Sequence, residues 1–152
     1  MPECRVTETR TRVRYKETDQ MGIAHHANYL VWFELGRTDL CREAGLLYRE
    51  IEELGLLMVV TEICCTYRVP YRYDDEVLIR TRIGDRTSRS MQFEYELWNG
   101  GGTTKHATGH SRHLWLDRRE RRPVLPPAEV LAVFEPFFGK GRSDLSIGSD
   151  RP

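Results

Sequence analysis

The sequence lacks features that mark several large classes of protein. No apolar run approaches the roughly 20 residues that a membrane-spanning helix needs. The first ten residues have no apolar segment typical of a signal peptide, so a cytoplasmic location is expected. Lys plus Arg and Asp plus Glu each number 23, so the chain has no basic excess of the kind that general nucleic-acid binders show. The composition therefore argues against a membrane span and against a nucleic-acid partner.

Cysteine is scarce and is not spaced for metal binding. None of the four cysteines forms a CxxC pair, and adjacent residues on a strand point to opposite faces; they are Cys4, Cys41, Cys64 and Cys65. Zinc binding by these residues is therefore not expected. In a reducing compartment we expect them to be buried or half-buried free thiols.

The length of 152 residues suits one domain. Hydrophobic periodicity and turn residues predict a strand, a long helix, a short helix, four strands and a terminal helix. Their expected ranges are 6–15, 28–44, 47–55, 56–69, 75–87, 88–99, 103–117 and 127–137. We expect residues 1–136 to form the domain and 137–152 to be a flexible tail, because the last stretch has no face that could pack.

The long predicted helix is apolar nearly all round in its first half, which is typical of a helix enclosed by other structure. Asn28 is a candidate N-cap, and Gly45 is a favoured residue just past a helix end. On the strand over 103–117, small residues around Gly109 could let a helix lie close against the sheet. The pattern predicts an α+β fold in which an antiparallel sheet wraps around one central helix. An open sheet edge invites a second copy, so we expect a homodimer or a larger assembly.

One stretch, "RYKETDQMGIAHHANYLVWFELGRTDL", carries the chemistry-bearing residues. It resembles the signature of the hydroxybenzoyl-CoA thioesterase branch of the hotdog-fold superfamily, and the resemblance extends over about residues 8–135. The matching positions are Asp19, Gly22, His26, Asn28, Tyr29, Glu34 and Arg37. The resemblance implies a hotdog fold and hydrolysis of acyl-CoA, with a short-chain, medium-chain or aromatic acyl group. It also implies that no metal ion and no organic cofactor takes part, and that the chains pair into a homodimer or homotetramer.

Catalytic roles follow from the same resemblance for Asp19 and His26. The carboxylate of Asp19 would attack the thioester or activate water, because a thioester needs a nucleophile and stabilisation of the oxyanion. The backbone N–H of His26, in the first turn of the helix, could donate to the thioester carbonyl. Gly22, His25, Asn28 and Tyr29 are candidate substrate-binding residues. Three of them have an alternative role. Gly22 could supply a backbone angle that other residues disfavour, Asn28 could cap the helix, and Tyr29 could pack in the core.

Four further groups of polar or charged residues lie in the sequence. Glu34 is a reserve catalytic carboxylate, or it pairs with Arg37 three residues later. Basic and hydroxyl side chains between two predicted strands are candidates to bind the phosphates of CoA, and these are Arg86, Ser88, Arg89 and Ser90. The basic cluster at 118–122 reads more easily as a solvated turn. Three histidines on the last strand, His106, His110 and His113, do not share one face, which argues against a metal site.

Two other functions remain possible from the sequence. A dehydratase or hydratase of hydroxyacyl thioesters can use the same fold, with a histidine and a carboxylate placed across a dimer. A non-catalytic acyl-CoA-binding module is the second alternative, but it would leave the Asp19 motif without a use.

Overall fold

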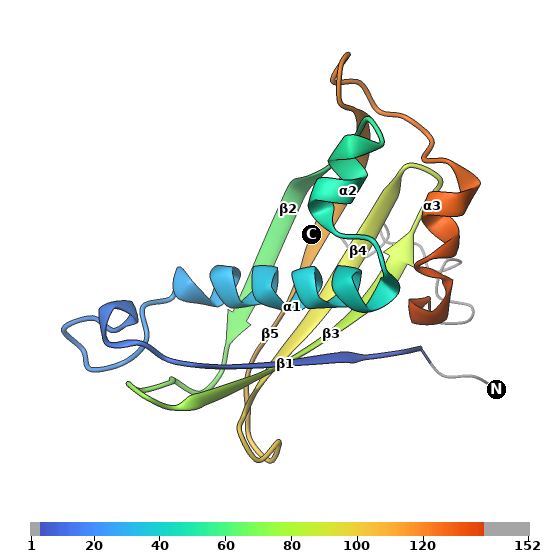
Figure 1. Ribbon diagram of the computed structural model, residues 1–152. Helices are drawn as coiled ribbons and strands as arrows, with labels where there is room; N and C mark the ends of the chain where they lie inside the picture. Colours follow the sequence, from blue (N-terminus) through green and yellow to red (C-terminus); the bar gives the residue numbers. More distant parts are fainter. Residues whose placement is uncertain (1–3, 139–152) are drawn as a thin grey trace.

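The computed structural model describes residues 4–138, which form an antiparallel sheet with a long helix packed against it (Figure 1). The strands within these residues are β1 (Thr7–Arg12), β2 (Leu56–Tyr67), β3 (Glu76–Arg86), β4 (Ser90–Asn99) and β5 (Lys105–Asp117). The helices are α1 (Asn28–Ala44), α2 (Tyr48–Glu53) and α3 (Ala128–Ala132), with 3₁₀ turns η1 (Tyr15–Glu17) and η2 (Glu135–Phe137). The predicted order of strands and helices is confirmed, with ends that differ by a few residues.

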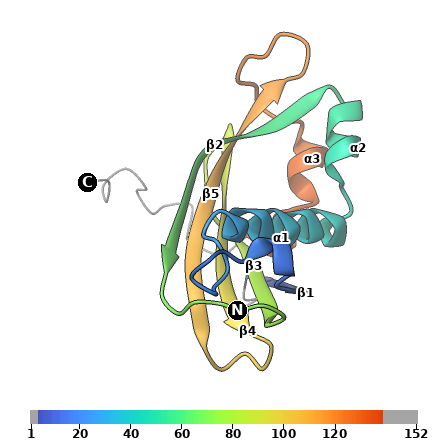
Figure 2. The same ribbon diagram turned by 90° about the vertical axis from the view of Figure 1, so that its left-hand side faces the viewer.

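The strand order across the sheet is β1-β3-β4-β5-β2, and all neighbouring pairs are antiparallel. β1 and β2 are therefore the two edge strands of the described sheet. The chain leaves β1, crosses one face of the sheet as α1, and returns as β2 on the opposite edge. Figure 2 shows the sheet curving around α1. This arrangement confirms the predicted α+β architecture of a sheet wrapped around one long helix.

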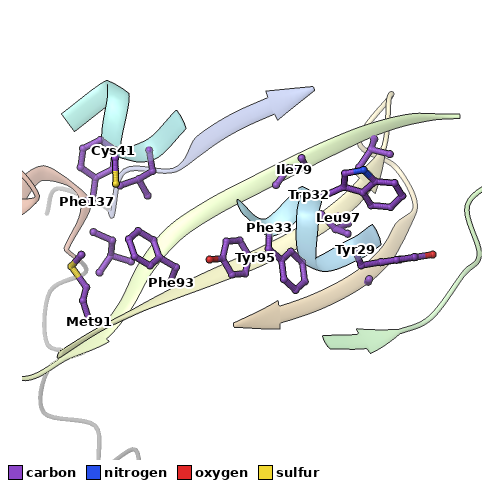
Figure 3. Packing of buried hydrophobic residues seen from close by; sticks show 14 of the residues in the cluster. Tyr29, Trp32, Phe33, Cys41, Ile79, Met91, Phe93, Tyr95, Leu97 and Phe137 are labelled. Atoms are coloured by element: carbon purple, nitrogen blue, oxygen red, sulfur yellow. The ribbon is translucent and has the colours of Figure 1, made fainter. Parts of the chain in front are cut away.

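Two glycines allow α1 to lie close to the sheet. A Cβ atom at Gly36 of α1 would collide with Thr81 Oγ1 of β3. A Cβ atom at Gly109 of β5 would lie 2.6 Å from ring atoms of Phe33. Phe33 in turn stacks on Tyr95 of β4, with ring centroids 4.3 Å apart (Figure 3). The close approach that the sequence predicted for the middle of the last strand therefore occurs at Gly109.

Within this one chain the sheet covers α1 on one side, so the expectation of an enclosed helix is met on that side and not on the other. Val31 and Leu35 lie one turn apart and are 46% and 39% exposed. Glu34 is exposed as well, whereas Arg37 is buried and its Nη1 lies 3.4 Å from the hydroxyl of Tyr95. The alternative of a Glu34–Arg37 pair is therefore wrong, because Glu34 is exposed to solvent while the Arg37 guanidinium is buried beside Tyr95.

The domain extends past the boundary predicted at residue 136. Phe137 is fully buried, and its carbonyl oxygen accepts a hydrogen bond from Cys4 Sγ at 2.9 Å. Phe138 forms a bridge with Ile83, and the guanidinium of Arg86 lies 3.7 Å from the centre of its ring. These two aromatic residues belong to the packed domain, because they bury surface against the sheet. The remainder of the predicted tail, 139–152, lies outside the described residues.

The contact at Gly109 gives a direct test of the packing. Gly109→Ala should lower the free energy of unfolding by about 1–3 kcal/mol, since the added methyl group must displace Phe33 or the backbone of β2. Gly101→Ala is the control, because a Cβ atom there meets nothing within 4 Å, and it should change stability by less than about 0.5 kcal/mol. Urea unfolding measures both. Equal stability of the two variants would contradict the close approach of α1.

Candidate active site

A pocket of about 250 Å³ lies where the loop before α1 meets the end of β2. Residues from three segments line it, and they are Asp19, Met21, Ile23, Ala24, His26, Tyr29, Tyr67, Arg68, Val69 and Pro70. Three of the residues predicted from the sequence motif, Asp19, His26 and Tyr29, therefore surround one cavity. Gly22, His25 and Asn28 lie in the same segment but outside this lining.

The loop that carries Asp19 is closed by hydrogen bonds of its own backbone. The Asp19 N–H donates to Ile23 O at 3.0 Å, and the Gly22 N–H donates to Asp19 O at 2.9 Å. Gly22 has a φ of 81°, which L residues with a side chain rarely adopt, so its predicted backbone role is confirmed. Asp19 Oδ1 accepts the N–H of Met21 at 2.9 Å. The second carboxylate oxygen, Oδ2, has no hydrogen-bond partner among residues 4–138 and remains available to a ligand.

The backbone donors of the turn before α1 can be counted one by one. The N–H groups of His25, Asn28, Tyr29 and Leu30 donate to the carbonyl oxygens of Glu17, His25, His26 and Ala27. The Ala27 N–H donates to the imidazole Nδ1 of His25 at 3.2 Å. Within the described part of the chain, the His26 N–H is the donor of this turn that has no acceptor. A free N–H at the start of a 17-residue helix is a donor for a negatively charged or polarised oxygen.

His25 and Asn28 have local partners. The His25 ring stacks on the His26 ring with centroids 4.2 Å apart, while its Nδ1 accepts from Ala27. Asn28 is the first residue of α1, and Ala27 occupies the N-cap position with helical backbone angles. The N-cap alternative for Asn28 was therefore wrong. Its side-chain amide instead donates to two backbone carbonyl groups, those of Glu17 and His25.

Tyr67 is a residue of the pocket that no motif in the sequence indicated. Its hydroxyl donates to His26 O at 3.0 Å, and its ring centroid lies 4.7 Å from that of Tyr29. Burial, with Cys65 as a hydrogen-bonding neighbour, raises the pKa of Tyr67 to about 12, so the hydroxyl is a donor at neutral pH. Burial also raises the pKa of Tyr29. The position of Tyr67 follows from the register of β2, which a sequence pattern does not specify.

Glu17 is a second residue that sequence reasoning missed. It is 3% exposed, and its carboxylate accepts the backbone N–H of Arg14 at 2.7 Å and Arg14 Nη2 at 3.1 Å. Its carbonyl oxygen accepts the His25 N–H at 2.7 Å. Glu17 thus ties η1 to the turn before α1. The paired charge on Arg14 compensates for burying the carboxylate.

The predicted phosphate-binding residues lie far from this pocket in one chain. Ser90 and Val59 both pair with Leu114, so the β3–β4 hairpin is level with Val59 of β2. Tyr67 lies eight residues further along β2, which is about 26 Å at roughly 3.3 Å per residue. Ser88 and Arg89 are exposed at the hairpin. The structure therefore does not bring Arg86, Ser88, Arg89 and Ser90 to the pocket of their own chain.

The histidines of β5 have separate partners. His106 Nδ1 lies 2.9 Å from Val69 O, and His110 Nε2 lies 3.1 Å from Glu62 Oε1. His113 Nε2 lies 2.8 Å from Ser111 Oγ. Burial, followed by the nearby Arg37 guanidinium, lowers the pKa of His113 to about 3, so this ring is neutral at physiological pH. Among residues 4–138 no three His, Cys, Asp or Glu side chains gather in a way that could hold a metal ion.

Residues 13–134 match the thioesterase-like superfamily. The chain belongs to this superfamily. None of the helices within residues 4–138 has the length and hydropathy that crossing a membrane requires. The cytoplasmic location expected from the sequence stays a prediction.

Relatives of this thioesterase-like chain cover most of its length. YneP of Bacillus subtilis is 37% identical over 119 residues, which are 78% of this chain and 86% of YneP. The acyl-CoA thioesterase YbgC of Haemophilus influenzae is 31% identical over 81% of this chain and 90% of its own.

Solved structures of bacterial proteins share the fold. A DHNA-CoA thioesterase from Staphylococcus aureus has a TM-score of 0.80 at 25% identity, covering 86% of this chain and 89% of that one. A protein from Thermus thermophilus has a TM-score of 0.80 at 35% identity, covering 86% and 98%. The hotdog fold and the thioesterase family expected from the sequence are therefore confirmed.

Proposed function

We propose that the pocket at the start of α1 hydrolyses acyl-CoA thioesters to a free acid and CoA. One observation supports this most strongly. The carboxylate of Asp19, with one oxygen available, and His26, whose N–H has no acceptor among residues 4–138, line the same cavity. A nucleophile or base and an oxyanion donor are the two groups that thioester hydrolysis requires. The names of the relatives support the same substrate class.

The chemistry follows from the two groups. In one route, Asp19 takes a proton from water, and the hydroxide attacks the carbonyl carbon. In the other route, the carboxylate attacks directly and forms a mixed anhydride that water then cleaves. In both routes the negative charge that develops on the carbonyl oxygen is stabilised by the His26 N–H and by the positive end of the α1 dipole. The C–S bond breaks when this charge collapses back to a carbonyl, which in the second route happens as the anhydride forms and before water cleaves it. CoA leaves as a thiolate that takes up a proton.

The walls of the pocket favour an acyl group with aromatic or aliphatic character. Tyr29 and Tyr67 face each other edge to face, and Ile23, Val69 and Pro70 complete an apolar lining. A ring or a short to medium chain buries apolar surface against these side chains. An aromatic acyl group also agrees with the DHNA-CoA thioesterase from Staphylococcus aureus.

A second copy of the chain completes the proposed site. β2 is a long edge strand, and its side chains Val60, Ile63 and Tyr67 are 47%, 36% and 46% exposed. Such a strand pairs readily with another strand, here β2 of a second copy. Antiparallel pairing places the start of one β2 beside the end of the other. The hairpin of one copy, with Arg86 and Ser88–Ser90, is thereby carried to the end of the molecule at which the other copy holds Asp19.

Asp19→Asn tests the proposed reaction. The amide can neither take a proton from water nor attack a thioester, so thiol release from acyl-CoA should fall at least about a hundredfold. Release of free CoA, followed with a thiol reagent across short-chain, medium-chain and aromatic acyl-CoAs, measures it. The same assay separates hydrolysis from hydration or dehydration, which liberate no thiol. Near-normal turnover by the variant would remove Asp19 from the mechanism.

Two substitutions at His26 separate its backbone from its side chain. His26→Pro removes the N–H, and kcat should fall about 10²–10³-fold, which is the usual cost of losing one oxyanion donor. His26→Ala keeps the N–H and should retain kcat within about tenfold. The measurement is kcat for acyl-CoA hydrolysis, with thermal unfolding to show that both variants fold. A larger loss in His26→Ala than in His26→Pro would assign the role to the imidazole.

The oligomeric state tests the shared site. Wild-type protein should sediment with at least twice the mass of one chain, and Ile63→Asp should shift it toward monomer, because a carboxylate at the β2 edge would be buried without a partner. Leu125→Asp is the control, since Leu125 is exposed and follows β5 in the chain, outside β2. Activity should fall with dissociation in Ile63→Asp. A monomeric wild-type protein with full thioesterase activity would contradict the proposal.

A further inference from the structure

The side chain of Asn28 connects the two halves of the proposed site. Its Nδ2 donates to Glu17 O at 2.9 Å and to His25 O at 3.2 Å. Glu17 lies two residues before Asp19, and His25 lies immediately before His26. One primary amide therefore joins the segment that leads to the carboxylate to the turn that carries the free N–H. Asn28 itself lies outside the pocket lining.

The direction of the His26 N–H depends on this contact. The carbonyl of His25 and the N–H of His26 belong to one planar trans peptide group and point in opposite directions. The carbonyl oxygen of His25 accepts two hydrogen bonds from Asn28, one from the backbone N–H at 3.0 Å and one from Nδ2. Because both donors hold the carbonyl on the side of α1, the N–H is held away from the helix.

The other acceptor of Asn28 is fixed in its own right. Glu17 O also accepts the His25 N–H at 2.7 Å, and the buried Glu17 carboxylate binds the backbone of Arg14. Asn28 thus donates to two carbonyl groups that are themselves held in place. Removing its amide would leave His25 O with the backbone N–H of Asn28 as its remaining donor, so the peptide group between His25 and His26 would be held less firmly. η1 would keep its anchor to Arg14.

We infer that Asn28 is a positioning residue for hydrolysis, one that sets the direction of the His26 N–H relative to Asp19 without contacting the substrate. This inference rests on the proposed function. It assigns Asn28 a role behind the pocket, in contrast to the substrate-binding role that the family resemblance implies. It also gives a reason for a primary amide at the first position of α1, where the side chain caps no backbone N–H.

Steady-state kinetics of Asn28→Ala test the inference. The value of kcat for acyl-CoA should fall about 10–100-fold, less than the loss of an oxyanion donor, while KM stays within about threefold because no substrate contact is removed. Thr9→Val is the matched control. It removes another hydrogen bond to α1, from Thr9 Oγ1 to Asp39 Oδ2 at 2.8 Å, far along the helix from the pocket, and should leave both constants within about threefold. Asn28→Ser, with one donor in place of two, should give a kcat between wild type and Asn28→Ala.

Amide hydrogen exchange provides a readout that does not depend on turnover. In Asn28→Ala the amides of His25 and Asn28 should exchange at least about tenfold faster, with the middle of α1 unchanged. An unchanged kcat, or a raised KM at constant kcat, would overturn the positioning role, and so would unchanged exchange. Asp19→Asn separates the two proposals. Full turnover by Asp19→Asn would reject the proposed function. Hydrogen exchange in Asn28→Ala would still decide whether Asn28 orders the turn before α1.

Discussion

The close contact of α1 with the sheet is the constraint on which the rest of the structure depends. Gly36 on the helix and Gly109 on β5 leave room for Phe33 to stack on Tyr95. A side chain at either glycine would separate the two layers. This contact fixes where the first residues of α1 lie, and therefore where Asp19 and His26 meet Tyr67 at the end of β2. The site is thus positioned by packing that lies two turns away from it.

Hydrogen-bond accounting explains why the turn before α1 is suited to an oxyanion. Helix starts usually leave several N–H groups unpaired. In the turn before α1, the N–H groups of residues 25 and 27–30 donate to acceptors. Within the described residues the N–H of His26 has no acceptor. Glu17, Asn28 and Tyr67 each form a hydrogen bond with the backbone of His25 or His26. A donor that is held in place before the reaction needs no reorganisation as charge develops.

The polar groups of this protein divide into two kinds by their surroundings. Tyr95, Ser111 and His113 form a hydrogen-bonded chain inside the core, next to the buried Arg37. These side chains are hydrogen-bonded to one another, and the low pKa of His113 keeps that ring uncharged. Asp19 and His26, in contrast, border a cavity and retain one available group each. A sequence pattern does not distinguish the two kinds, because both contain histidines and hydroxyl groups at similar spacing.

The sequence by itself determined the order of elements, the place of Gly109 and the motif around Asp19, because each depends on local spacing or on side-chain period. It did not determine that Val31 and Leu35 stay exposed, that Asn28 reaches back to Glu17, or that Tyr67 closes the pocket. It also did not predict that the hairpin at 86–90 and Asp19 lie at opposite ends of β2 in one chain. These features were decided by the tertiary structure, since they depend on strand register and on the packing of segments tens of residues apart.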